Sequence, residues 1–182
     1  MKVRFKYFCL FGGLIFVLIF QLLIPFQLSA QYEKNVLKAA YLERITRFID
    51  WHQNPGLRVT ENFVIGVYED NDFFNVLKTV LENKTIKGKP VEVIQIRNLK
   101  KIEICDLLYI SGIKENEVSG IITIANKCGI LTVSEIEGFG VKGIHINFFI
   151  EDKKLKFEIN RHSIDLGKFK VSSLLLKNSN II

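Results

Sequence analysis

The sequence predicts a single three-layer α/β domain built on a mostly parallel sheet, with helices on both faces and a C-terminal antiparallel hairpin. Three observations predict it. Short apolar segments rich in β-branched residues recur along the chain, stretches with helical spacing separate them, and the last two apolar segments are joined by a tight turn. Alternating strands and helices favour parallel pairing through crossovers. Strands that are apolar throughout, such as 107–110, are typical of a sheet covered on both faces.

The first thirty residues have the three parts of a secretory signal peptide. Three basic residues lie within the first six positions, residues 7–28 are almost entirely apolar, and Ala30 precedes a polar stretch. Cleavage after Ala30 leaves residues 31–182 as one domain. The alternative is a retained anchor, because about 20 apolar residues span a bilayer. Pro25 and Gln27 near the end of the apolar run favour cleavage. Either way, residues 31–182 are expected outside the cytoplasm.

The charge of the chain argues against a nucleic-acid partner. The whole sequence has a net charge of +6, but three of its 25 basic residues and none of its 19 acidic ones lie in the first thirty positions. The remaining domain is therefore near +3, with both signs evenly mixed. Nucleic-acid-binding proteins usually cluster Lys and Arg on one face, and no such run occurs here.

Hydrophobic spacing predicts each element in order. Residues 33–52 have the three- and four-residue apolar spacing of an amphipathic helix. Trp51, near its end, is expected to pack in or beside the core. The polar run at 70–72 is expected to cap a helix reaching Asn83. Strands are predicted at 62–68, 91–96, 107–110 and 130–133, and a further helix at 114–126.

The C-terminal third departs from this alternation. Segments 143–150 and 155–159 are predicted to form a hairpin through the turn at 151–154. Asn160 is expected to cap a short helix that reaches Gly167. A final helix is expected after Lys170, with four apolar residues buried: Val171, Leu174, Leu175 and Ile181.

Two motifs suggest chemistry that their context does not support. Gly138, Gly140 and Gly143 match the dinucleotide pattern G-x-G-x-x-G, but a predicted strand follows them where that site needs a helix. The three histidines have no partner at a metal-ligand spacing, and His145 is expected to face solvent from a strand. No cofactor, metal or catalytic set is therefore predicted.

Polar residues at the ends of two predicted strands form a candidate ligand cleft. Ser111 follows the strand at 107–110, and Ser134 and Glu135 follow the strand at 130–133. In open α/β sheets, ligands bind beyond the carboxyl ends of the strands. The plainer interpretation is that Glu135 and the nearby Glu137 are two solvated acids.

Two cysteines remain after export. Cys105 and Cys128 each lie two residues before a predicted strand. If these strands are parallel neighbours, the cysteines lie at the same end of the sheet, where a disulfide requires Cα atoms within about 7 Å. The compartment permits such a bond. The alternative is two separate thiols.

Several segments together resemble the YfiR-like family of periplasmic regulators. They follow the family's order and span most of residues 31–182. The resemblance rests on these motifs: KAAYL at 38–42, FIDW at 48–51, FVIGVY at 63–68, CDLLYIS at 105–111, ILTVSE at 130–135 with Gly138 and Phe139, FEIN at 157–160 and SSLL at 172–175.

The resemblance implies a non-enzymatic regulator. It would bind the extracytoplasmic sensing domain of a membrane-bound diguanylate cyclase, hold it inactive, and so limit cyclic di-GMP and biofilm formation. Homodimers and disulfides occur in such proteins. This chain has Glu135 where Asp is usual, and its two cysteines do not allow several bridges. Accessory binding to a sensor kinase and binding of a small ligand remain alternatives.

A partner surface is predicted after the hairpin. Glu158, Asn160, Arg161 and His162 place charged and polar side chains together behind a strand. The plainer interpretation is that Glu158 and Asn160 only cap and tie the turn.

Overall fold

The structure is a computed structural model that describes residues 31–51 and 61–182. The predicted signal peptide, its cleavage site and His52 lie outside the described residues. Contacts divide the chain into two units, residues 1–35 and 36–182. In the first unit residues 31–35 are helical, and the second unit is the α/β domain described below.

Among the described residues the main sheet has eight strands in the order β10-β8-β7-β6-β5-β2-β4-β3. Strands β4, β2, β5, β6 and β7 are parallel neighbours, and β7 and β8 form the predicted antiparallel hairpin. The fold class is therefore confirmed. The strands are β2 (Phe63–Tyr68), β3 (Thr85–Ile86), β4 (Lys89–Ile96), β5 (Leu107–Ile110), β6 (Leu131–Ser134), β7 (Ile146–Glu151), β8 (Lys154–Ile159) and β10 (Asn180–Ile181).

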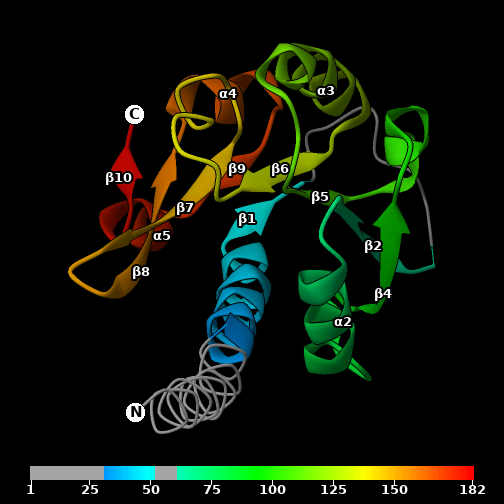
Figure 1. Ribbon diagram of the computed structural model, residues 1–182. Coiled ribbons are helices and arrows are strands. Elements are labelled where there is room, and N and C mark those ends of the chain that lie inside the picture. Colours follow the sequence, from blue (N-terminus) through cyan, green and yellow to red (C-terminus); the bar gives the residue numbers. More distant parts are fainter. Residues whose placement is uncertain (1–30, 52–60) are drawn as a thin grey trace, which may run out of the picture. The chain divides into compact units, whose positions relative to one another are not determined.

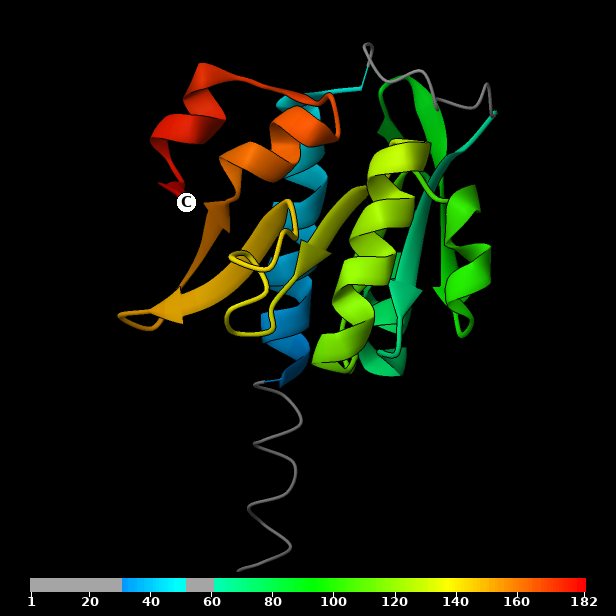
Figure 2. The same cartoon turned by 90° about the horizontal axis from the view of Figure 1, so that it is seen from above.

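Helices cover both faces of this sheet (Figures 1 and 2). The helix at 36–47, α2 (Asn71–Val80) and α5 (Ser173–Lys177) pack on one face, and η1 (Leu99–Ile104) and α3 (Glu115–Cys128) pack on the other. Neighbouring strand residues alternate between the two apolar layers, so Leu107 and Tyr109 face the first and Leu108 and Ile110 the second. This alternation explains why the strand is apolar throughout.

Local signals in the sequence begin and end several elements. The Asp70 carboxylate accepts a hydrogen bond from the Phe73 amide at 2.8 Å and caps α2. Asn160 caps α4 (Arg161–Leu166) in the same way. Asp152 and Lys153 both have positive φ angles, as a two-residue hairpin turn requires.

Two helix predictions are wrong at their ends. The first helix stops at residue 47, and β1 (Ile49–Asp50) then pairs with β9 (Lys170–Val171) in a separate antiparallel sheet. The last helix has only five residues, because β9 precedes it and β10 follows it. Leu174 and Ile181 are consequently exposed, while Leu175 is buried. A strand of two residues is too short to show an alternating hydrophobic pattern in the sequence. Only its backbone pairing with another strand in the structure identifies it.

Candidate functional site

The chain reverses its direction of sheet growth between β2 and β5. From β2 it first adds β4 on one side, and then crosses back to add β5, β6 and β7 on the other. This order is that of flavodoxin-like sheets, in which ligands bind outside the carboxyl ends of the strands at the reversal. Tyr68, Ile110 and Ser134 end β2, β5 and β6 at this edge.

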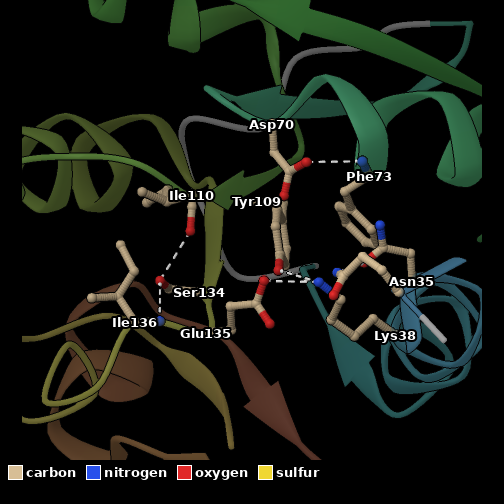
Figure 3. A network of polar contacts seen from close by, with 10 residues as sticks. Asn35, Lys38, Asp70, Phe73, Tyr109, Ile110, Ser134, Glu135 and Ile136 are labelled. Atoms are coloured by element: carbon tan, nitrogen blue, oxygen red, sulfur yellow. Dashed lines mark hydrogen bonds and ion pairs between the residues drawn. The ribbon is translucent and has the colours of Figure 1, made fainter. Parts of the chain in front are cut away.

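A buried lysine lies at this edge (Figure 3). The Lys38 ammonium donates to the Glu135 carboxylate at 2.8 Å and to the Tyr109 hydroxyl at 3.4 Å. It also lies 4.8 Å from the centre of the Phe73 ring and 5.7 Å from that of Tyr109. The Lys38 side chain is 2% exposed, whereas that of Glu135 is 34% exposed. Lys38 thus connects the first helix to the carboxyl ends of β5 and β6.

Tyr109 keeps its proton in this setting. Burial raises the pKa of its hydroxyl far above the ordinary value, and the charges of Glu135 and Asp70 raise it further. A protonated phenol and an ion-paired ammonium offer neither a base nor a free nucleophile. We call Lys38, Tyr109, Glu135 and Phe73 the Lys38 cluster. We regard it as a structural element that holds the first helix against the carboxyl edge of the sheet.

The three residues of the predicted ligand cleft lie at this edge, but the side chains of two of them already bond to other residues. The buried Ser134 hydroxyl donates to the Ile110 carbonyl at 3.0 Å and accepts from the Ile136 amide at 3.2 Å. Glu135 is bound by Lys38. Ser111 is half-buried one residue beyond β5. Their role toward a ligand stays a prediction.

The predicted partner surface divides into two inner and two outer residues. Asn160 caps α4 and donates to the Gly140 carbonyl at 2.8 Å, and Glu158 accepts from the Asn147 side chain at 3.2 Å. Arg161 and His162 are exposed. The inner pair ties the turn, as the plainer interpretation has it, and leaves the outer pair on the surface.

A hollow of about 460 Å³ lies beside α4. Arg161, Asp165 and Lys168 contribute charged side chains to its lining, and Ile164 and Phe169 contribute apolar ones. Interfaces between proteins usually combine an apolar centre with a charged rim. The α4 surface, meaning Arg161, His162 and this hollow, therefore has the mixed character that partner recognition needs.

The two cysteines belong to the same apolar layer, the one between the sheet and α3. Strands β5 and β6 are parallel neighbours with Leu107 opposite Leu131, as the disulfide prediction required. Cys105 is buried, and Cys128 is partly buried at the end of α3. The Cys105 and Cys128 sulfurs are not bonded to each other in the structure. The disulfide between them stays a prediction for the oxidised protein.

The expectation that His145 faces solvent is wrong. Its side chain is fully buried, and Nδ1 lies 2.6 Å from the Thr132 hydroxyl and 3.1 Å from the Thr132 amide. The ring also packs edge-on against Phe169, 5.0 Å away. Burial lowers the pKa of His145 to about 3. His145 lies just before β7 and points inward. Apolar and polar residues alternate only partly along this segment, so the sequence did not reveal the direction of the His145 side chain.

Trp51 packs as predicted. Its ring is 5% exposed and makes edge-on contacts with Phe63 and Phe169 at 5.4 and 5.8 Å. The glycine motif at 138–143 leads into β7, so the strand predicted after it is confirmed.

Lys38 and Tyr109 were not singled out from the sequence. A signal was present, because Lys38 lies on the helix face that carries Leu42 and Ile45, at four- and seven-residue spacing. A lysine on an apolar face indicates a buried charge with a partner. The partner could not be named, because Glu135 is 97 residues away in sequence.

Among the described residues, no three His, Cys, Asp or Glu side chains gather closely enough to hold a metal ion. Within residues 31–51 and 61–182, no helix has both the length and the hydropathy to cross a bilayer.

The fold and the edge cluster define a doubly wound α/β domain whose carboxyl-edge charges are used for internal contacts. The YfiR/HmsC-like family profile matches residues 35–180, and the chain belongs to this family of periplasmic regulators. No curated protein matches the chain.

Two solved structures match the chain at low sequence identity. A conserved domain protein from Vibrio cholerae O1 biovar El Tor strain N16961 superposes with a TM-score of 0.55 and 12% identity over 79% of this chain and 59% of that one. The chain thus spans about three-fifths of that protein's length. The ABC domain in complex with L-Trp from Streptococcus pneumoniae gives a TM-score of 0.46 and 13% identity over 65% and 55% of the two chains.

Proposed function

We propose that this protein is exported and represses a membrane-bound diguanylate cyclase by binding the cyclase's extracytoplasmic sensing domain. Family membership over residues 35–180 is the observation that carries the proposal. The resemblance of the motifs supports the same role. On this proposal the protein lowers cyclic di-GMP inside the cell without catalysing a reaction.

The α4 surface is the proposed contact for the receptor. Asn160 and Glu158 support it from inside the fold through their bonds to Gly140 and Asn147. Arg161 is exposed and pairs with Asp165, four residues along α4, at 3.3 Å. A surface ion pair of this kind contributes little stability, so Arg161 can exchange Asp165 for a receptor carboxylate at small cost.

The experiment is a pull-down against any membrane-bound diguanylate cyclase or sensor kinase that a neighbouring gene encodes, combined with deletion of the gene for this protein. We expect binding, and we expect cyclic di-GMP to rise after deletion. The variant Arg161→Ala/His162→Ala should lose binding. The control variant Lys84→Ala changes an exposed lysine near the opposite sheet edge and should keep it. Absent binding together with unchanged cyclic di-GMP would contradict the proposal, and binding to a sensor kinase would support the accessory alternative.

A small-ligand role is the second candidate, because the sheet has the strand order whose carboxyl edge holds ligands in other folds. A thermal-shift screen against amino acids, nucleotides and sugars tests it. Binding of one compound, lost in Ser111→Ala, would support this role. A flat response to the whole panel would count against it.

A further inference from the structure

Strand β8 has one edge that is only partly covered. Its inner edge pairs with β7 along its whole length, whereas β10 pairs with its outer edge only at Glu158 and Ile159. The Ile159 carbonyl accepts from the Ile182 amide at 3.0 Å. Backbone groups alternate in direction along a strand, so Leu155 also directs its amide and carbonyl to the outer edge. No other strand of the described chain pairs with it there.

A groove of about 670 Å³ runs along this open edge. The hairpin contributes Lys153, Lys154 and Lys156 to its lining, and the end of α5 contributes Lys177. The lining includes no acidic residue. Figure 1 shows α5 and β10 beside β8. The rest of the lining is apolar at Leu37, Tyr41, Leu155 and Phe157 and polar but uncharged at Asn178, Ser179 and Asn180.

The charge of this groove determines which strand could join it. Lysines on an exposed edge discourage pairing with a second identical edge, because like charges would meet. Lys156 already pairs with Glu151 on β7, whereas Lys153, Lys154 and Lys177 form no ion pair with another described residue. An acidic extended segment would meet these ammonium groups, and its backbone could bond to Leu155.

We propose that this β8-edge groove binds an extended acidic polypeptide segment, which adds to the sheet as a strand beside Leu155. Main-chain hydrogen bonds supply affinity in this mode, and side-chain contacts at alternate positions supply specificity. The groove consists of residues other than those of the α4 surface, so it is a second interaction site. The groove proposal is tested with the purified protein and synthetic peptides. A negative result would not contradict receptor binding at the α4 surface.

The first experiment compares three fluorescent peptides by anisotropy. The probe has about ten residues, a typical strand length, alternating Glu and Val. One control replaces every Glu with Lys. The other keeps the Glu–Val sequence but N-methylates every second amide, which preserves charge and removes the donors that a strand ladder needs. We expect the probe to bind, and both controls to bind at least about tenfold more weakly, a difference of 1.4 kcal/mol.

The second experiment compares two charge-reversed variants. Lys154→Glu/Lys177→Glu changes the groove, and Lys84→Glu/Lys101→Glu makes the same change in net charge with exposed lysines elsewhere. The first should weaken probe binding at least about tenfold and the second less than about twofold. Equal loss in both variants, or full binding of the N-methylated peptide, would overturn strand addition. Binding to phosphatidylglycerol vesicles without peptide binding would overturn the polypeptide and indicate a membrane surface.

Discussion

Neutralising Glu135 should destabilise the protein more than neutralising Lys38, although the two groups form one ion pair. The variant Glu135→Gln leaves the Lys38 ammonium in place, 2% exposed and without its counter-charge. Lys38→Met instead removes the buried charge with a side chain of similar length. The remaining Glu135 carboxylate is 34% exposed and can be hydrated.

The expected magnitudes follow from these exposures. Leaving a buried charge without its partner costs about 3–5 kcal/mol. We expect about 3 kcal/mol for Glu135→Gln, because the rings of Phe73 and Tyr109 still face the ammonium and a cation–π contact retains about 0.5–2 kcal/mol. Replacing a buried charge by an apolar side chain is often neutral, so Lys38→Met should cost less than about 1 kcal/mol. In a domain of this size the shifts in Tm are about 6–12 °C and less than about 4 °C.

Urea denaturation at pH 7, followed by circular dichroism, measures both variants. The double variant Lys38→Met/Glu135→Gln is the matched control, because it removes both charges and should be nearly as stable as Lys38→Met alone. A loss in Glu135→Gln equal to or smaller than that in Lys38→Met would refute the reasoning. It would mean that water reaches the ammonium.

Three further predictions concern stability. Burial lowers the pKa of His145 from 6.5 to about 3, so its contribution is complete above pH 6.5 and is lost as pH falls toward 3. The unfolding free energy should drop by about 2 kcal/mol between pH 6.5 and 4.5 from this group, and His145→Gln should remove that part of the slope; equal slopes would contradict it. Gly66→Ala should cost about 1–3 kcal/mol, because a Cβ there would lie 2.5 Å from the Cys105 sulfur. Gly120→Ala, with open space around it, should instead stabilise α3 by up to about 1 kcal/mol, and urea titration of both variants checks the contrast. Asn160→Ala should cost about 1 kcal/mol or more through loss of the α4 cap and the bond to Gly140, and unchanged hydrogen exchange in α4 would contradict this.

Much of the fold could be predicted because its signals are local. Asp70 and Asn160 are N-caps whose side chains bond within three residues, and the strand at 107–110 was located to the residue. The errors lie where a distant partner decides the outcome. Residues 49–50 continue a helical pattern, yet pairing with β9, 120 residues later, makes them a strand.

The candidate site was predicted less well than the fold. Ser134 and Glu135 lie at the carboxyl ends of the parallel strands, as expected, because these ends share one edge of the sheet. Their partners were missed. Ser134 bonds to Ile110, and Glu135 bonds to Lys38, at separations of 24 and 97 residues. The sequence shows that a residue carries a hydroxyl or a carboxylate. Whether that group already has a hydrogen-bond partner depends on which residues the fold brings near it.

The sequence by itself determined the alternation of strands and helices, the hairpin, the caps and the family, since each depends on neighbouring residues or on motifs in order. Only the tertiary structure decided that Lys38 is buried against Glu135, that His145 points inward, and that β8 keeps an open edge lined by lysines. The physical reason is that burial and pairing are properties of surroundings. A charged or titratable side chain has the same intrinsic chemistry everywhere, and the packed neighbours determine its solvation and partners.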